Sequence, residues 1–276
     1  MDHGRMGGKR VLVTGAGTGI GRGIAREFAR AGAAVVLHYA HSRTGAEAEV
    51  AALRDAGGTA HALEADFRDA AAARALPGRA AALLGGLDVL VNNAGITMNE
   101  PFFQTTLAQY DTLFDVNVRA MFFATQGAAE IMTAAGSGAV INVSSVHAYG
   151  AMVEHVVYAA TKAAIVGFTR TLSLELIQKN VRVNCIASGW VMVENELAER
   201  GPDFDPVEAG KVLPRGYSAE GADIGRLAIF LASEDSRFIV GQTILCDGGQ
   251  TTVLPCTPDF RTPGTIKRGR GYVPGR

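Results

Sequence analysis

The chain has 276 residues, 26 Lys and Arg against 27 Asp and Glu, a formal net charge of -1 at pH 7, and a hydrophobic content of 48%. This composition predicts a soluble globular protein with enough apolar material for one large core. Binding to nucleic acid needs a basic excess, so we expect no nucleic-acid partner, although a local basic patch is not excluded.

Charge is distributed unevenly along the chain. Residues 251–276 hold five basic residues and one acidic residue, a charge of +4, so residues 1–250 carry -5. The same tail contains four of the nine prolines and has no helical or alternating pattern. We therefore expect one catalytic domain over residues 1–250, followed by a basic Pro/Gly-rich tail over 251–276 that forms no core of its own.

Cysteine and histidine usage argues against metal sites and disulfides. Cys185, Cys246 and Cys256 lack CxxC spacing, which predicts neither a disulfide framework nor a thiolate zinc site and favours a reducing cytoplasm. The first two fall in predicted buried strands. The six histidines form no HExxH or HxH group, so no metal is expected. We also expect no secretory signal and no membrane span, because no long apolar run without charge occurs.

Short runs rich in β-branched residues alternate with longer alanine-rich segments at helical spacing. Strands are predicted at 10–14, 34–39, 60–64, 89–91, 139–143, 181–186 and 243–246. Helices are predicted at 19–31, 44–56, 69–84, 106–135, 157–178 and 219–232. Several strand candidates are apolar at nearly every position, as strands buried on both faces are. The order predicts an α/β fold of the Rossmann type, with a doubly wound, seven-stranded parallel sheet and helices on both faces.

Residues 190–217 leave this pattern. They are rich in acidic residues and proline and have few apolar anchors. A loop of that length inside a compact domain is either functional or disordered. We expect it to form a lid over the substrate.

A glycine-rich turn follows the first predicted strand. The sequence over residues 14–21 reads TGAGTGIG, with glycines at positions 15, 19 and 21 of a GxxxGxG pattern. Glycines let a diphosphate approach the backbone N–H groups at a helix start, where the helix dipole favours an anion. Taken alone, the turn indicates a dinucleotide site, with a plain turn or another phosphate ligand as alternatives.

Downstream motifs supply the context for that turn. The sequence has NNAG at 92–95, Asn117 inside the long helix, Ser145 after the fifth strand and YAATK at 158–162. Tyr158 and Lys162 are spaced i, i+4, so both project from one helix face. Together with the TGxxxGxG turn, these motifs resemble the short-chain dehydrogenase/reductase family, in its single-domain branch of roughly 250 residues. The resemblance runs from about residue 9 to residue 249.

The resemblance implies an enzyme that moves a hydride between a nicotinamide cofactor and a ketone or secondary alcohol. In it, Tyr158 gives and takes the proton, because the positive charge of Lys162 favours the phenolate of an otherwise weak acid. Ser145 bonds the substrate oxygen; Ser144 is the neighbouring alternative, and the family's spacing before the tyrosine selects Ser145. Asn117 holds a water that completes the proton relay. Each residue also has a plain structural interpretation, as a surface pair, a helix cap or a weak helix former.

The resemblance further implies where a cofactor binds. The expected cofactor-binding residues are Gly15, Thr18, Gly19, Ile20, Gly21, His41, Ser42, Arg43, Asp66, Phe67, Asn93, Ala94, Gly95, Tyr158, Lys162, Gly189 and Val191. Asp66 matches the position that bonds the adenine. The chain departs from the usual pattern at Ser188, often a proline, and at Val193, often a threonine, which puts the contacts there in doubt.

Charge after the second strand bears on which cofactor is used. An NAD site places an acid there to bond the ribose 2′-OH, and that acid repels a 2′-phosphate. Residues 37–43 read LHYAHSR and contain no acid, while Arg43 and His41 are available and Arg22 lies near. We expect NADP(H) to be preferred, with NAD(H) possible.

The substrate is expected to be a small polar ketone, sugar or polyol. Possible wall positions are Asn99, His147, Tyr149, His155 and Trp190, although exposed loop histidines are the other interpretation of His147 and His155. The alternatives are a 3-oxoacyl thioester reductase, a non-catalytic dinucleotide-sensing protein, and a nucleotide-sugar epimerase or dehydratase. By resemblance, the helices at 106–135 and 157–178 form the contacts of a cytoplasmic homotetramer. The tail then packs along a neighbouring subunit, unless it is a solvated flexible end.

Overall fold

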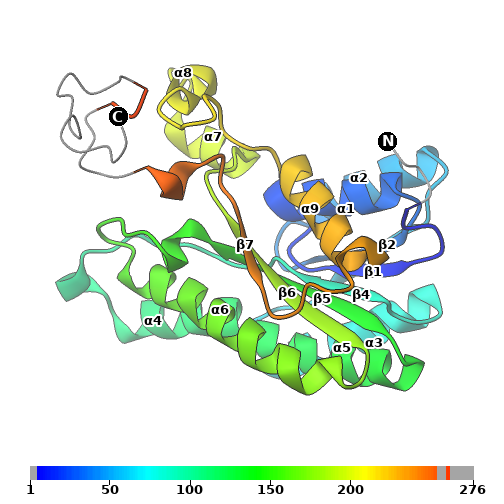
Figure 1. Ribbon diagram of the computed structural model, residues 1–276. Coiled ribbons are helices and arrows are strands. Elements are labelled where there is room, and N and C mark those ends of the chain that lie inside the picture. The colour runs from blue at the N-terminus through cyan, green and yellow to red at the C-terminus, as the bar shows by residue number, and fades with distance from the viewer. Residues whose placement is uncertain (1–4, 254–258, 262–276) are drawn as a thin grey trace, which may run out of the picture.

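Seven strands form one parallel sheet in the order β3-β2-β1-β4-β5-β6-β7 (Figure 1). The computed structural model describes residues 5–253 and 259–261. The strands are β1 (Arg10–Val13), β2 (Ala34–Tyr39), β3 (Ala60–Glu64), β4 (Val89–Asn92), β5 (Gly138–Ser145), β6 (Val181–Ser188) and β7 (Thr243–Cys246). The predicted doubly wound sheet is confirmed.

Helices cover both faces of the sheet (Figure 1). One face carries α1 (Gly19–Arg30), α2 (Arg43–Asp55) and α9 (Gly221–Ala232); the other carries α3 (Ala70–Leu84), α4 (Leu107–Phe114), α5 (Ala120–Ala135) and α6 (Val156–Ile177). Successive residues of a strand point to opposite faces. Val11 and Val13 accordingly belong to one buried apolar cluster and Leu12 to the other. This explains why the strands read as continuous apolar runs.

The predicted helix at 106–135 is continuous but changes its winding in the middle. Between α4 and α5 lies a π-helical segment, Asp115–Arg119. Such segments are rare and often mark functional sites. The segment contains Asn117, so this local change of winding sets the position of a predicted site residue.

Three strands extend further than predicted. β4 continues to Asn92, which pairs with Asn142. β5 and β6 continue through Ser144–Ala187 and Ser145–Ser188 pairs. The predicted strands ended at their last apolar residue. The hydrogen bonds between neighbouring strands join backbone groups only, so polar residues can continue a strand. Cys246 was predicted to lie in a buried strand, but it is half-buried, because β7 is at the edge of the sheet.

The segment 190–217 contains regular structure. It holds α7 (Glu194–Arg200) and α8 (Pro206–Gly210), and Val191 pairs with Ala219 in an isolated parallel bridge. Most of the predicted tail lies outside the described residues. Of the residues that are described there, Arg261 donates hydrogen bonds to the carbonyls of Lys211 and Leu213 beside α8, at 2.5 and 2.8 Å.

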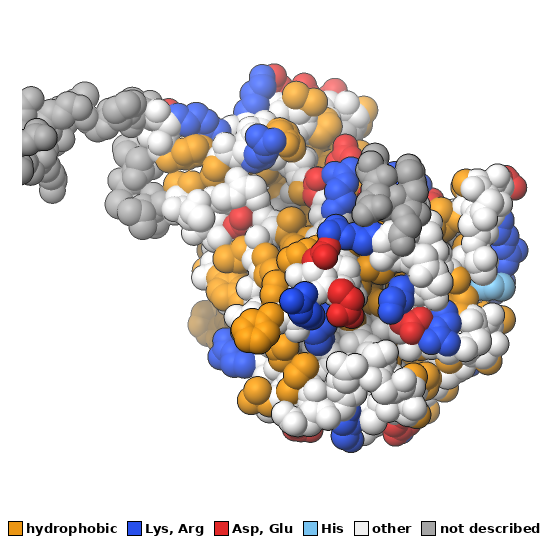
Figure 2. Space-filling model, turned by 45° about the vertical axis from the view of Figure 1, so that its right-hand side comes forward, with side chains coloured by type: hydrophobic (Ala, Val, Ile, Leu, Met, Phe, Trp, Pro, Cys, Tyr) orange, Lys and Arg blue, Asp and Glu red, His pale blue; other side chains and the backbone are white. Residues whose placement is uncertain are grey.

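The surface carries charges of both signs. On the face drawn in Figure 2, Lys and Arg side chains alternate with Asp and Glu rather than forming a basic stripe. Among the described residues, no helix is both long enough and apolar enough to cross a membrane.

Candidate active site

The glycine turn joins β1 to α1 at the carboxyl edge of the sheet. Gly15 and Gly19 have φ angles of 63° and 56°, a region that side chains rarely adopt. A Cβ on Gly15 would lie 2.8 Å from Ala94 Cα, and one on Gly21 would overlap the Gly15 carbonyl. The turn is therefore closed tightly by its own backbone, which leaves the N–H groups at the start of α1 directed outward.

The residues after β4 hold this turn in place. Thr14 Oγ1 accepts hydrogen bonds from the N–H groups of Asn93 and Ala94, each at 3.0 Å. Asn93 Nδ2 donates to the carbonyls of Thr14 and Gly15 at 3.0 and 3.1 Å. Asn93 and Ala94 thus lie beside the glycine turn and fix its shape.

His38 is a supporting residue that sequence reasoning missed. Its Nδ1 accepts a hydrogen bond from the Gly15 N–H at 3.1 Å, and its Nε2 donates to the Ala65 carbonyl at 3.0 Å. Burial and the positive charge of Arg79 lower the pKa of His38 to about 4, although the hydrogen bond to the Ala65 carbonyl acts in the opposite direction. The imidazole is therefore neutral at pH 7 and able to accept. The available signal was a polar residue inside the apolar run of β2.

The segment 190–217 reaches the glycine turn through two neighbouring residues. Val193 packs over Gly19, with its Cγ1 3.2 Å from the place of a Cβ on that glycine. The Glu194 carboxylate accepts a hydrogen bond from the Gly19 N–H at 3.0 Å and pairs with Arg22. An anionic oxygen is therefore bound at the start of α1, where the sequence predicted a diphosphate.

The residues after β2 and β3 lie at the far end of the turn. Ser42 packs against Gly17, and His41 is exposed. Arg43 lies over the Tyr39 ring, with its guanidinium carbon 5.6 Å from the ring centre, and pairs with Glu64 and Glu47. Sequence reasoning found Arg43 but missed these two acids, which come from β3 and from the next turn of α2.

Asp66 and Phe67 differ in what they can offer a ligand. Hydrogen bonds from the Arg68 side chain and backbone lower the pKa of Asp66 to about 2, so this carboxylate is ionised. The Phe67 ring is buried and stacks on His38, with ring centres 4.2 Å apart. A contact from Phe67 to a ligand would therefore come from its backbone.

Tyr158 and Lys162 leave α6 one turn apart. Lys162 Nζ lies 5.6 Å from the centre of the Tyr158 ring and donates a hydrogen bond to the Val143 carbonyl at 3.2 Å. Lys162 is 6% exposed, while Tyr158 is half-buried. An ammonium has three N–H donors. The Val143 bond uses one of them, so the geometry leaves Lys162 able to bind a further acceptor beside Tyr158.

Asn117 is held by the loop after β4 and by α6. Its Oδ1 accepts from the Ile96 N–H at 2.8 Å, and its Nδ2 donates to the Ile96 carbonyl at 2.9 Å and to Thr161 Oγ1 at 3.1 Å. Both Asn117 Oδ1 and Lys162 Nζ lie within 3.5 Å of the place of a Cβ on Gly95. The structure thus brings Asn117, Lys162 and Gly95 together.

The two adjacent serines are distinguished by their partners. Ser144 Oγ donates to the Lys162 carbonyl at 2.8 Å and is buried, which ties it to α6. Ser145 ends β5, and its Oγ accepts from the His147 N–H at 3.3 Å. The Ser145 hydroxyl hydrogen is therefore the one left for a ligand.

Gly189 and Val191 follow β6 at the same edge of the sheet. The Gly189 N–H donates to the Cys246 carbonyl at 3.0 Å, and a Cβ on Gly189 would lie 2.6 Å from Asp247 Cα. Val191 is buried. Thr18 is the N-cap residue of α1, and Ile20 packs on the core below it. Within residues 5–253 and 259–261, no three His, Cys, Asp or Glu side chains gather to hold a metal ion.

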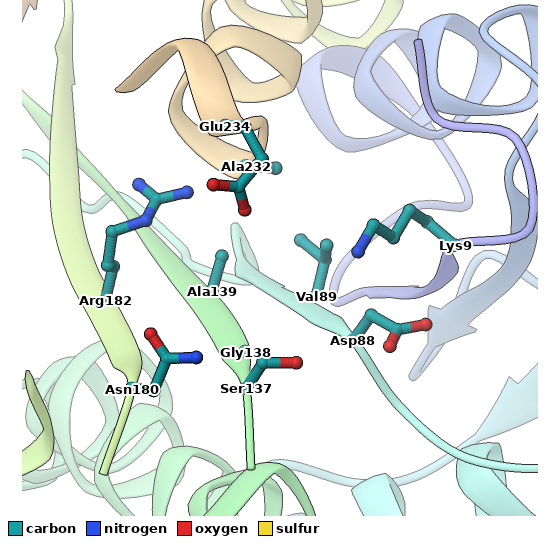
Figure 3. A pocket seen from close by; sticks show the side chains of 10 residues that line it. All are labelled: Lys9, Asp88, Val89, Ser137, Gly138, Ala139, Asn180, Arg182, Ala232 and Glu234. Carbon is teal, nitrogen blue, oxygen red and sulfur yellow. The ribbon is translucent and has the colours of Figure 1, made fainter. Parts of the chain in front are cut away.

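A small hollow of about 60 Å³ lies at the opposite edge of the sheet. Figure 3 shows that residues at the starts of β4, β5 and β6 line it, with Lys9, Arg182 and Glu234 around it. Arg182 donates to the carbonyls of Leu231, Ser233 and Ser236, so it serves the packing of α9. The hollow has no part in the site around Tyr158.

Known proteins resemble this chain over most of its length. A family model described as enoyl-(acyl carrier protein) reductase matches residues 15–251. An uncharacterized oxidoreductase of Methylorubrum extorquens is 40% identical over 89% of this chain and 98% of its own length. The 3-oxoacyl-[acyl-carrier-protein] reductase of Staphylococcus aureus is 34% identical over 87% of this chain and 97% of its own length.

A solved structure extends the comparison to three dimensions. A short chain dehydrogenase from Burkholderia cenocepacia, crystallised in complex with NADP, is 34% identical and superposes with a TM-score of 0.82, covering 90% of this chain and 99% of that one. Likeness at this level of identity, over nearly the whole of both chains, extends to the family as well as the fold. The chain belongs to the short-chain dehydrogenase/reductase family of oxidoreductases.

Proposed function

We propose that the chain interconverts a ketone and a secondary alcohol, with Tyr158, Lys162, Ser145 and Asn117 as its catalytic residues. The observation that carries this proposal is the approach of the Lys162 ammonium to the Tyr158 ring, 5.6 Å from its centre. The Ser145 hydroxyl, which accepts from the His147 N–H, keeps its own hydrogen available for the substrate. When bound, the nicotinamide supplies or accepts the hydride. The protein groups orient the substrate and move the proton.

Each side chain has one task in this mechanism. The Tyr158 hydroxyl gives its proton to the carbonyl oxygen during reduction and takes it back during oxidation. The Lys162 charge stabilises the phenolate in between. The Ser145 hydroxyl donates a hydrogen bond to the substrate oxygen and polarises the carbonyl. Asn117 orders the loop after β4 through Ile96, and it would hold a water that links Lys162 to solvent and returns the proton.

The turn fits a dinucleotide cofactor. The three closely packed glycines form a cradle that any Cβ would fill, and the Gly19 N–H already binds a carboxylate oxygen. Gly15, Thr18, Gly19, Ile20 and Gly21 would hold the diphosphate. Asp66 and the Phe67 backbone would bind the adenine end; Asn93, Ala94, Gly95, Gly189 and Val191 would line the adenosine and nicotinamide sides.

We infer a preference for NADP(H) over NAD(H). Arg43, Ser42 and His41 lie after β2 without an acid among them, so a 2′-phosphate would meet a cation there. The acids Glu64 and Glu47 pair with Arg43 from outside this segment and reduce its free charge. We therefore expect a moderate preference, with NAD(H) also used.

The proposed substrate is a small polar ketone, sugar or polyol. The half-buried histidines beside Tyr158 and the polar loop after β4 support it. A 3-oxoacyl thioester is the second candidate, supported by the family model's description and by the Staphylococcus relative. For the assembly we propose a cytoplasmic homotetramer. Its support is the exposed Phe122 of α5 and Leu174 of α6, on the helices expected to make subunit contacts.

The proposed domain organisation keeps the division between a catalytic domain and a basic tail. We propose one catalytic unit over residues 1–250, with 190–217 as the substrate lid and 251–276 as an appendage that packs on a neighbouring subunit. Deleting residues 251–276 tests the last part. An unchanged KM together with an unchanged oligomer size would reject it.

Replacing Tyr158 by Phe tests the proposed reaction. The variant keeps the ring but loses the proton, so we expect turnover to fall by at least about 100-fold, while the Kd for NADPH stays within about twofold. Tyr110→Phe, on an exposed tyrosine of α4 that has no part in the proposed site, is the matched control. Activity of Tyr158→Phe close to that of the unmodified enzyme would reject the mechanism.

A further inference from the structure

Two histidine rings gather beside the proposed catalytic tyrosine. His147, in the short 3-10 helix η3 (Val146–Ala148), lies edge-to-face with Tyr158, with ring centres 5.3 Å apart and ring planes at 76°. It also stacks on His155, with centres 5.0 Å apart. Both histidines are half-buried, so their interpretation as exposed loop residues is wrong.

The backbone on either side holds these rings. The His147 N–H donates to Ser145 Oγ at 3.3 Å, which fixes η3 directly after the serine. Before His155, Glu154 has a φ of 67°, an uncommon conformation for a residue with a side chain. Its carbonyl accepts a hydrogen bond from the Glu100 N–H at 2.9 Å. The strained backbone of Glu154 is therefore held in place by its surroundings, here by a hydrogen bond from another loop.

The two imidazoles differ in their hydrogen bonds. His155 Nδ1 lies 2.9 Å from the Val153 carbonyl, and because a carbonyl can only accept, this nitrogen carries the proton. For His147, neither ring nitrogen has a hydrogen-bond partner within the described part of the chain. The half-buried ring therefore has both nitrogens available for a hydrogen bond with a ligand or with water.

The charge state of His147 determines what it can bind. Burial, with the charges of His155 and Lys162, lowers the pKa of His147, so the ring is neutral at pH 7. A neutral imidazole has one donor and one acceptor nitrogen. A hydroxyl group also donates and accepts, whereas the second oxygen of a 3-oxoacyl thioester is a carbonyl that only accepts. The ring therefore matches a hydroxyl better than a thioester.

We propose that His147 is a substrate-binding residue that hydrogen-bonds a hydroxyl on the carbon next to the reacting one. The substrate class is then a hydroxylated ketone and the corresponding vicinal diol. This inference rests on the proposed function, because Tyr158 is the group that holds the reacting oxygen and His147 flanks it. It narrows the small polar ketones to those with an adjacent hydroxyl.

Two probe ketones test the inference through kinetics. We would measure kcat/KM with NADPH for 2-hydroxycyclohexanone and cyclohexanone in the unmodified enzyme, in His147→Phe and in His155→Phe. Phenylalanine keeps a ring against Tyr158 but cannot hydrogen-bond. We expect His147→Phe to lower kcat/KM for the hydroxyketone about tenfold, the loss that one hydrogen bond produces, and to change that for cyclohexanone less than about twofold. His155→Phe should leave the ratio of the kcat/KM values for the two ketones unchanged.

A binding measurement separates this inference from the proposed reaction. Enzyme saturated with NADPH cannot oxidise an alcohol, so the Kd values of trans-1,2-cyclohexanediol and cyclohexanol report binding alone. We expect the diol to bind more tightly, and His147→Phe to remove that difference. The role of His147 would be overturned if His147→Phe lowered kcat/KM equally for the two ketones, weakened binding of the diol and of cyclohexanol equally, or changed neither quantity. Absence of ketone reduction with the diol preference intact would instead refute the proposed function and leave the role of His147 standing.

Discussion

The Glu194 carboxylate accepts a hydrogen bond from the Gly19 N–H at 3.0 Å, which ties the segment 190–217 to the glycine turn. Burial opposes ionisation of this carboxyl, but backbone hydrogen bonds and the Arg22 charge outweigh it, so the pKa of Glu194 is lowered. The group is a carboxylate at neutral pH. Because diphosphate oxygens bind to the same kind of N–H group at a helix start, we expect Glu194 and a cofactor to compete for this donor.

Removing that charge should strengthen cofactor binding. In Glu194→Gln we expect the Kd for NADPH to fall by a factor of several up to about ten. Arg22 loses its ion-pair partner, and the Gly19 N–H keeps only a neutral and weaker acceptor, which a diphosphate displaces more easily. Isothermal titration measures it. Glu208→Gln on α8 removes the same charge from a residue paired with Lys211, and should leave the Kd unchanged. Weaker binding in Glu194→Gln would mean that the carboxylate assists the cofactor.

The glycine turn should tolerate no methyl group at Gly21. A Cβ there overlaps the Gly15 carbonyl, so Gly21→Ala should lower the free energy of unfolding by about 1–3 kcal/mol and weaken NADPH binding. Gly78→Ala is the matched control, because Gly78 lies exposed inside α3 with no atom within 4 Å of its Cβ position. The free energy of unfolding of Gly78→Ala should rise by about 0.5–1 kcal/mol. Urea denaturation of both variants tests the difference, and similar losses in the two would contradict it.

His38 should make the fold sensitive to mild acid. In the unfolded chain its pKa is about 6.5, and in the folded chain about 4. As the pH falls between these values, the unfolded state binds the proton first, so the free energy of unfolding decreases, by about 3 kcal/mol in total. The contribution is fully present above pH 6.5. His38→Gln should lack this component in denaturation curves between pH 7 and 4, and identical pH slopes for the two proteins would disprove it.

Arg43 should set the cofactor preference. We expect Arg43→Ala to raise the KM for NADPH about tenfold and to leave that for NADH nearly unchanged, because only NADPH carries the 2′-phosphate. Glu64→Gln should act in the opposite direction by freeing Arg43 from its partner. Steady-state kinetics with both cofactors measures these ratios. Equal changes for NADPH and NADH in Arg43→Ala would place the 2′-position elsewhere.

Local patterns were sufficient for most of the fold. Apolar runs and helical spacing predicted all seven strands, because burial on both faces leaves a continuous signal in each strand. They did not predict the winding change at Asn117, since a π-helical segment has the same composition as the helix around it. They also placed a featureless loop where α7 and α8 form, because short helices depend on tertiary contacts more than on propensity.

For the site, the sequence by itself determined the glycine turn and the Tyr158–Lys162 pair, because each is a spacing within one turn or one helix face. Only the tertiary structure decided which partners complete them. His38 reaches Gly15 across 23 residues, and Glu194 reaches Gly19 across 175. The stack of His147 on His155 depends on how the loop between β5 and α6 folds back. Contacts of this kind depend on strand order and loop path, which leave no periodic signal in the chain.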